Sequence, residues 1–234
     1  MRAPEAKFWA VIPAAGVGRR MGAARPKQYL QLAGRSVIEH TLERFLNHPG
    51  LRGVVVAVGD GDPYWPQLKH ACDARIARVA GGTERADSVR NALLALSDRA
   101  AGSDWVLVHD AARPCLAAED LTRLLQTLQD HPVGGILGTP ARDTMKRVNA
   151  EGEIEATVDR TTLWHALTPQ MFRLAPLLRS LELARENGWT VTDEASAVEQ
   201  AGLKPRIVEG RADNIKITRP EDLAYAEWLL HRSG

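Results

Sequence analysis

A chain of 234 residues is long enough to bury a substantial hydrophobic core. Its apolar fraction of 44% and charged fraction of 25% are those of a globular protein and argue against extensive disorder. The net charge of +1 provides no overall field to hold a nucleic acid or an anionic membrane, so we expect neither as a partner. Two cysteines without a CxxC pair predict no disulfide framework, and the N-terminal residues lack a signal-peptide pattern. We therefore expect a cytoplasmic protein.

Short β-branched runs alternate with longer amphipathic stretches along the chain. We predict strands over residues 8–13, 53–58, 76–79, 105–109 and 135–139. Apolar side chains at helical spacing predict helices over residues 37–46, 89–96 and 121–128. Strands separated by helices favour an α/β fold, in which right-handed crossovers build a mainly parallel sheet flanked by helices.

Two segments depart from this alternation. Residues 16–35 show no clear periodicity, and a loop of this length usually has a function. Residues 142–159 contain strand-like pieces at 145–148 and 154–158 around Glu151 and Gly152. This pattern predicts a β-hairpin that extends from the sheet.

The C-terminal region closes with short extended pieces and a helix. Residues 206–208 and 214–217 are strand-like. The four residues from Thr218 to Glu221 fit a capping box, which satisfies free backbone N–H groups at a helix start. We therefore predict a structural role for Thr218.

Glycines follow the first predicted strand directly. Without a Cβ, glycine lets backbone N–H groups approach a phosphate closely, and ligands of parallel sheets bind at the carboxyl ends of the strands. The Walker pattern is absent, because Gly16 and Gly22 are misspaced and no lysine follows. The dinucleotide pattern GxGxxG fails where Met21 replaces its third glycine, so a dehydrogenase is disfavoured.

The same region is strongly cationic. Residues 6–38 contain no Asp or Glu, whereas the basic side chains there are Lys7, Arg19, Arg20, Arg25, Lys27 and Arg35. Arginine can hold phosphate oxygens bidentately, and lysine adds a compact charge. A cationic glycine loop at the end of a strand predicts a polyphosphate site.

A series of short motifs occurs in a fixed order along the chain. The motifs are Pro13-Ala-Ala-Gly-x-Gly-x-Arg20, Pro26-Lys-Gln-Tyr29, Gly81-Gly82 with Glu84-Arg-x-Asp-Ser-Val89, His109-Asp-Ala-Ala-Arg-Pro114, Asp143-Thr-Met-Lys146, Asp159-Arg160, Leu163-Trp-His-Ala-Leu-Thr-Pro-Gln170, Thr192-Asp-Glu-Ala195 and Asn214-Ile-Lys216. This series resembles the 2-C-methyl-D-erythritol 4-phosphate cytidylyltransferase family of the non-mevalonate isoprenoid pathway. The resemblance extends from about Trp9 to Ala226.

This resemblance implies a fold and a reaction. Residues 1–234 would form a single nucleotidyltransferase domain with a Rossmann-like sheet. The phosphate of methylerythritol phosphate would attack the α-phosphorus of CTP and release pyrophosphate. Mg²⁺, carried mainly by the CTP phosphates, would accompany the nucleotide. A phosphate dianion is already a nucleophile, so catalysis would reduce to alignment and charge stabilisation.

The resemblance also assigns residues to the nucleotide. Arg20 and Lys27 match the family's transition-state stabilisers. The predicted nucleotide-binding residues are Ala14, Ala15, Gly16, Gly18, Gly82, Thr83, Arg85 and Ser88. Thr83 has a structural alternative as the N-cap of the following helix.

A second set is assigned to the acceptor. Arg160 and Lys216 would position its phosphate for attack, and we count both among the catalytic residues. The predicted acceptor-binding residues are Asp110, Arg113, Thr144, Arg160, Thr168, Thr192 and Lys216. No residue is predicted as a protein ligand of the metal, and direct contact of Asp110 with Mg²⁺ stays open.

Structural alternatives exist for two members of the acceptor set. Thr192 would serve equally as a helix N-cap. Arg160 would form an exposed ion pair with Asp159, which contributes little to stability. His109, at a strand end, is more often a satisfied structural histidine than a catalyst, and we leave it and His165 out of the site.

The predicted hairpin also indicates how two copies of the chain associate. A two-stranded arm is marginal alone, and in the family such arms exchange between subunits. We therefore expect a homodimer through residues 142–160, with Thr144 and Arg160 completing the neighbour's site. The nearest rival function is a cytidylyltransferase for another polyol phosphate, such as ribitol 5-phosphate. A regulatory nucleotide-binding module is disfavoured, because binding alone would not need two facing sets of cations.

Overall fold

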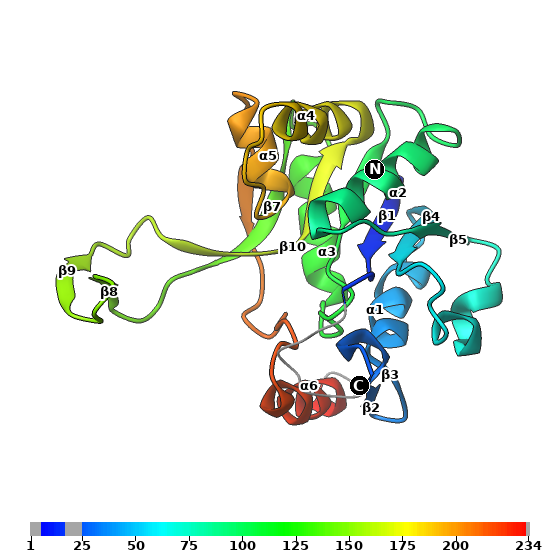
Figure 1. Cartoon of the computed structure of the whole chain (residues 1–234), viewed down its shortest axis with the longest axis horizontal. Coiled ribbons are helices and arrows are strands. Elements are labelled where there is room, and N and C mark those ends of the chain that lie inside the picture. The colour runs from blue at the N-terminus through cyan, green and yellow to red at the C-terminus, as the bar shows by residue number, and fades with distance from the viewer. Residues whose placement is uncertain (1–5, 17–24, 233–234) are drawn as a thin grey trace, which may run out of the picture.

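The computed structural model describes residues 6–16 and 25–232. Within them, one sheet has the strand order β11-β7-β10-β6-β1-β4-β5 (Figure 1). Only β10 is antiparallel to its neighbours in that sheet, so the predicted mainly parallel α/β fold is confirmed. Its strands are β1 (Phe8–Pro13), β4 (Leu51–Val58), β5 (Ile76–Ala80), β6 (Trp105–Val108), β7 (Gly134–Pro140), β10 (Trp164–Arg173) and β11 (Arg206–Glu209).

Helices cover both faces of the sheet. In β1, Phe8, Ala10 and Ile12 pack on one side, whereas Trp9 and Val11 pack on the other. The first side is covered by α1 and α3, and the second by α2, α4 and α5. The helices are α1 (Val37–Leu46), α2 (Arg85–Ser97), α3 (Ala118–Leu128), α4 (Leu174–Glu186), α5 (Glu194–Gln200) and α6 (Pro220–Arg232). Among the described residues, none of these has the length and apolarity that a membrane crossing requires.

A smaller unit lies at one end of the molecule. Helix α6 and the short strands β2 (Gln31–Leu32) and β3 (Arg35–Ser36) lie together there (Figure 1). Leu32, Ala112, Ile217 and Ala226 form the core beneath them. The 3₁₀ helices are η2 (Lys27–Tyr29), η3 (Trp65–Gln67) and η4 (Lys69–Cys72).

The order of the strands places a crevice at their carboxyl ends. From β1 the chain proceeds to β4 and β5 on one side, and later returns to β6 on the other side of β1. Such a reversal of strand order opens a crevice above the carboxyl ends, where ligands bind. The loops after β1, β5 and β6 therefore meet at one edge of the sheet.

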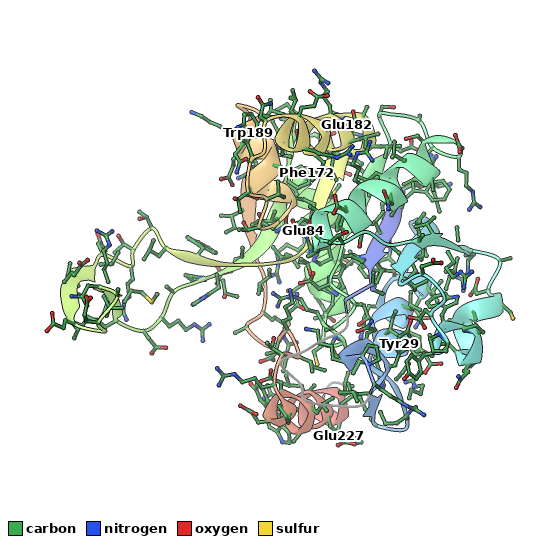
Figure 2. The ribbon with its side chains drawn as sticks, viewed as in Figure 1. Tyr29, Glu84, Phe172, Glu182, Trp189 and Glu227 are labelled. Atoms are coloured by element: carbon green, nitrogen blue, oxygen red, sulfur yellow. The ribbon has the colours of Figure 1, made fainter. Side chains whose placement is uncertain are left out.

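The predicted hairpin is present and extends far from the sheet. Strands β8 (Met145–Val148) and β9 (Ile154–Val158) pair antiparallel and form their own two-stranded sheet. They lie at the tip of a long arm between β7 and β10 (Figure 1). The arm's side chains stand clear of the rest of the chain (Figure 2).

Two C-terminal predictions are wrong. Residues 214–217 form a loop, in which the Ile217 N–H donates to the Ala112 carbonyl without a continuing ladder. Helix α6 begins at Pro220, and its start is capped by Asp222 rather than Glu221. The Asp222 carboxylate accepts the N–H groups of Thr218 and Arg219, while the Thr218 hydroxyl donates to the Lys216 carbonyl.

Candidate active site

A pocket of about 370 Å³ opens at the carboxyl ends of β1, β5 and β6. Its wall combines the loop after β1, the turn before α2, the loop after β6 and the loop that precedes α6. Ten of the residues predicted for the site line it, namely Ala14, Ala15, Gly16, Lys27, Gly82, Thr83, Arg85, Ser88, Asp110 and Lys216. We call it the nucleotide pocket.

The loop after β1 is fixed by a buried amide. Gln28 Nε2 donates to the carbonyl oxygens of Ala14 (2.6 Å) and Gly16 (3.1 Å). Next to it, Lys27 lines the pocket, and its Nζ donates to the Ile217 carbonyl at 2.8 Å. The backbone of the glycine loop is therefore held in place by the Pro26-Lys-Gln-Tyr29 segment.

The turn before α2 approaches that loop very closely. A Cβ on Gly81 would lie 2.3 Å from the Ala15 Cβ, and one on Gly82 would lie 2.2 Å from the Asp87 Cβ. Glycine is therefore required at both positions. Ser88 Oγ accepts the Gly82 N–H at 3.0 Å and donates to the Glu84 carbonyl, which organises the turn.

Oppositely charged side chains gather between β6, α2, α5 and the loop that precedes α6. The Asp110 carboxylate accepts from Arg85 Nε at 2.9 Å, contacts Lys216 Nζ at 2.9 Å and lies 3.4 Å from Arg113 Nε. Arg85 also holds Glu194 bidentately, at 2.6 and 3.0 Å. We call these residues the Asp110 cluster: Arg85, Asp110, Arg113, Glu194 and Lys216.

The charges of the cluster determine its protonation. Burial by itself would raise the pKa of Asp110, but the cations of Arg85, Lys216 and Arg113 outweigh it and hold that pKa well below its usual range. Burial would likewise lower the pKa of Arg85, yet Glu194 and Asp110 raise it. Asp110 and Arg85 are thus both charged at neutral pH, and the cluster joins three basic side chains to two acidic ones.

The histidine beside the cluster is structural and neutral. Burial lowers the pKa of His109 to about 4. Its Nε2 faces the Arg113 carbonyl at 3.0 Å, so Nε2 carries the proton and Nδ1 accepts from the Thr168 hydroxyl at 2.9 Å. Thr168 Oγ1 in turn accepts the Asp110 N–H at 3.2 Å. His109 and Thr168 therefore fix the backbone that carries Asp110.

A second pocket of about 260 Å³ adjoins the cluster. Arg85, Asp110 and Lys216 line both pockets. The other predicted acceptor residues found here are Arg113, Thr168 and Thr192. We call it the acceptor pocket after the residues that the motifs predict to bind the acceptor and that line it.

Comparisons with known proteins identify the family. The sequence profile of the 2-C-methyl-D-erythritol 4-phosphate cytidylyltransferase (IspD) family matches residues 8–232. The chain belongs to this family. The family's enzyme from Pseudomonas putida strain GB-1 is 63% identical over 226 residues, which are 96% of this chain and 95% of that protein. The Ectopseudomonas mendocina enzyme is 61% identical over 220 residues, 94% of each chain.

Solved structures agree with this assignment. The crystal structure of the Francisella tularensis enzyme has a TM-score of 0.84 at 36% identity and covers 96% of this chain and 100% of its own. The Thermus thermophilus enzyme has a TM-score of 0.78 at 32% identity, covering 95% of this chain and 98% of its own. The family and fold predicted from the motifs are therefore confirmed.

Some of the residues that match the family's motifs lie elsewhere. Gly18 and Arg20 fall outside the described residues. Thr144 and Arg160 are exposed on the arm and do not line either pocket in this chain. The alternative ion pair of Arg160 is not formed among the described residues, because Arg160 donates to the Arg142 carbonyl and Asp159 accepts the Thr161 N–H.

The predicted capping alternatives are each displaced by one residue. Helix α2 is capped by Glu84, which forms a capping box with Asp87, and not by Thr83. Helix α5 is capped by Asp193, whose carboxylate accepts the Ser196 N–H at 2.9 Å, and not by Thr192. Thr83 and Thr192 are both exposed and line the pockets.

Sequence reasoning missed Gln28 and Glu194. Both lie inside quoted family motifs, but neither motif reveals what the side chain contacts. Gln28 holds the glycine loop, and Glu194 holds Arg85. The signal available was their position close to residues already assigned to the site: Gln28 directly follows Lys27, and Glu194 lies two residues after Thr192.

Proposed function

We propose that this chain transfers the cytidylyl group of CTP to 2-C-methyl-D-erythritol 4-phosphate, a step of non-mevalonate isoprenoid biosynthesis. The products are 4-diphosphocytidyl-2-C-methyl-D-erythritol and pyrophosphate. The observation that carries this proposal is the pair of adjoining pockets that share Arg85, Asp110 and Lys216. A transfer between two phosphates needs two adjoining anion sites, so that an oxygen of one phosphate can approach the phosphorus of the other, and a cluster with more basic than acidic side chains at their boundary suits both.

The reaction needs no protein nucleophile. An oxygen of the acceptor phosphate attacks the α-phosphorus, the new P–O bond forms, and the bond to the β-phosphate oxygen breaks with release of pyrophosphate. Charge grows on the leaving group, and Lys27, which lines the nucleotide pocket, would stabilise it together with Arg20. Lys216 would hold the acceptor phosphate and offset its repulsion from the triphosphate.

The nucleotide would lie over the loop after β1. A Cβ on Gly16 would meet no protein atom within 4 Å, so packing within the described residues does not explain a glycine there. Close approach of a phosphate does explain it, and Ala14, Ala15 and Gly18 are expected to add backbone contacts. On the opposite wall, Gly82, Thr83, Arg85 and Ser88 would surround the cytosine and ribose.

Magnesium would be bound mainly through the CTP phosphates. Among the described residues, no group of three or more His, Cys, Asp or Glu converges to hold a metal. The carboxylates that line the nucleotide pocket are those of Asp110 and Glu84. The Asp110 carboxylate is already paired with Arg85 and Lys216. This fits an ion that prefers phosphate oxygens and waters, and Mg²⁺ bound there supplies charge neutralisation.

We propose that the active unit is a homodimer that shares its sites. At the tip of the arm, Val148 and Ile154 face each other across the strands and are 51% and 65% exposed. A two-stranded arm with exposed apolar side chains gains stability by packing on a partner. Arg160 and Thr144, which line neither pocket of their own chain, would then complete the acceptor pocket of the other subunit.

Mixing two inactive variants tests the shared site. Lys27→Ala and Arg160→Ala proteins are each expected to be nearly inactive, whereas a refolded mixture contains dimers with one intact site. Random pairing in a symmetric dimer predicts about a quarter of the wild-type activity. A mixture as inactive as its components would assign Arg160 to the site of its own chain, and an active Arg160→Ala protein would remove Arg160 from the site.

The acceptor identity is tested by pyrophosphate release. The protein is incubated with CTP and a panel of polyol phosphates that includes methylerythritol phosphate and ribitol 5-phosphate. We expect the highest kcat/KM with methylerythritol phosphate, by several orders of magnitude. Faster release with ribitol 5-phosphate would overturn the proposal, and so would release without any acceptor.

A further inference from the structure

Glu194 is a fully buried carboxylate that the proposed chemistry does not use. Its side chain is 0% exposed, and both of its oxygens accept from the Arg85 guanidinium, at 2.6 and 3.0 Å. Transferring a carboxylate from water into a protein interior is costly and is offset only when a well-placed cation and hydrogen bonds compensate it. A bidentate arginine pair supplies both the charge and a fixed direction.

The fold holds Glu194 in place from its own side. Asp193 caps α5, and the Gln170 amide on β10 donates to Asp193 Oδ2 at 2.8 Å. The same amide accepts the Ala195 N–H at 2.9 Å. Gln170 binds the residues on both sides of Glu194, so the backbone that carries Glu194 is held in place. The Glu194 carboxylate therefore fixes the position of the Arg85 guanidinium, rather than the reverse.

The guanidinium of Arg85 links Glu194 to Asp110 at the boundary of the two pockets. Its Nη1 and Nη2 are taken by Glu194, while its Nε donates to Asp110 Oδ1. The other oxygen of Asp110 contacts Lys216 Nζ. A planar guanidinium anchored at one edge has a fixed orientation at the other, so Glu194 fixes Arg85, and Arg85 in turn orients the Asp110 carboxylate that contacts Lys216.

We propose that Glu194 is a positioning residue for the transfer: through Arg85 it fixes the Asp110 carboxylate, and with it the Lys216 Nζ at the boundary of the two pockets. Glu194 itself touches no substrate, because it is buried behind Arg85 and lines neither pocket. This inference rests on the proposed function, since Lys216 is there assigned to the acceptor phosphate.

The substitution Glu194→Gln distinguishes a positioning role of Glu194 from an effect of its negative charge, because the two predict opposite changes in the KM of the acceptor. It removes one negative charge from the Asp110 cluster, which by itself would favour phosphate anions and lower the KM of the acceptor. It also weakens the hold on Arg85, which displaces Lys216 and raises that KM. We expect the acceptor kcat/KM to fall by roughly 10- to 100-fold, as for other displacements of a reacting group, with the acceptor KM raised. Because Arg85 also lines the nucleotide pocket, we expect the KM of CTP to rise as well, by a smaller factor than the KM of the acceptor.

Glu194→Asp keeps the charge but shortens the side chain by one methylene. A positioning role predicts a loss of acceptor kcat/KM in this variant too, whereas a role through charge alone predicts wild-type values. This variant also decides the question if Glu194→Gln does not fold.

Asp120→Asn is the matched control. Asp120 is also 0% exposed and paired with an arginine, Arg123 at 3.1 Å, but it lies on α3 and lines neither pocket. The control should lose thermal stability and keep the acceptor KM. A lowered or unchanged acceptor KM in Glu194→Gln, or wild-type kinetics in Glu194→Asp, would overturn the inference. If the wild type does not use methylerythritol phosphate, the proposed function fails instead, and the two failures are distinguishable.

Discussion

Lys216 Nζ lies 2.9 Å from Oδ2 of Asp110, so a cation from the loop that precedes α6 is held at the carboxyl end of β6. Asp110 is nearly buried, whereas the Lys216 side chain is 38% exposed. The carboxylate therefore anchors a lysine that still reaches solvent and both pockets. Such an arrangement presents one ammonium group to an incoming anion without loss of its position.

Replacing Lys216 by methionine removes the charge and retains most of the apolar stem. We expect the acceptor kcat/KM to fall by about 10²-fold, because a positioned cation on a reacting phosphate contributes on that scale. Steady-state kinetics with both substrates varied measures it. The control is Lys204→Met, at an exposed position outside both pockets, which should leave the kinetics unchanged. Equal effects of the two substitutions would contradict the role of Lys216.

Lys27→Ala should lower turnover much more than it weakens CTP binding. Lys27 lines the nucleotide pocket beside the loop after β1, where the leaving pyrophosphate would develop its charge. Loss of such a donor typically lowers kcat by about 10²–10³-fold. Calorimetric titration of CTP into the variant and a kcat measurement compare the two effects. Comparable losses in both would assign Lys27 to ground-state binding.

The strands that the sequence predicts are those with continuous β-branched runs. Strand β10 escaped prediction, although it lies between β6 and β7, because Pro169 and Gln170 interrupt its pattern. Residues 214–217 were predicted as a strand because Ile215 and Ile217 alternate with polar residues. Their alternation instead reflects burial of Ile217 beneath α6. Periodicity reports which side chains are buried, not which backbone groups pair.

The residues of the site likewise fall into those that the motifs identify and those whose contacts depend on the fold. Motif order identified the residues that face the pockets, such as Gly16, Lys27 and Asp110. It gave no sign that Glu194 would hold Arg85, because that contact joins the first residue of α5 to the first residue of α2, far apart in the sequence. It also gave no sign that the Thr168 hydroxyl would donate a hydrogen bond to His109 Nδ1. Side chains that are distant in sequence come into contact only in the folded protein, so the motifs alone do not predict these contacts.

Gly81→Ala should disturb the nucleotide pocket. The added Cβ would lie 2.3 Å from the Ala15 Cβ, and backbone-attached atoms of this kind cannot move aside without shifting their loop. We expect the KM of CTP to rise by about tenfold or more, since a 1 Å displacement in a site costs up to about 10² in rate. Gly59→Ala is the control, because a Cβ there meets no atom within 4 Å. An unchanged KM in Gly81→Ala would show that the two loops yield freely.

His109 makes the stability of the fold depend on pH. Burial lowers its pKa to about 4, against an ordinary value of 6.5. Between these two values the unfolded chain binds more protons than the folded one, so the free energy of unfolding decreases as the pH falls through this window. Burial also lowers the pKa of His40, which adds an effect of the same sign. The ionised Asp110 has a lowered pKa, so its own contribution is lost only in more acidic solution.

We therefore expect the free energy of unfolding in urea to be lower at pH 5 than at pH 7 by about 2 kcal/mol from His109 alone. His109→Gln should be less stable at pH 7, since its neighbours lose a fitted partner, and should show a smaller difference between the two pH values. Thr168→Val removes the hydroxyl that donates to Nδ1 but leaves the imidazole buried, so it should retain the pH difference. A His109→Gln protein with the full wild-type difference would place the titrating group elsewhere.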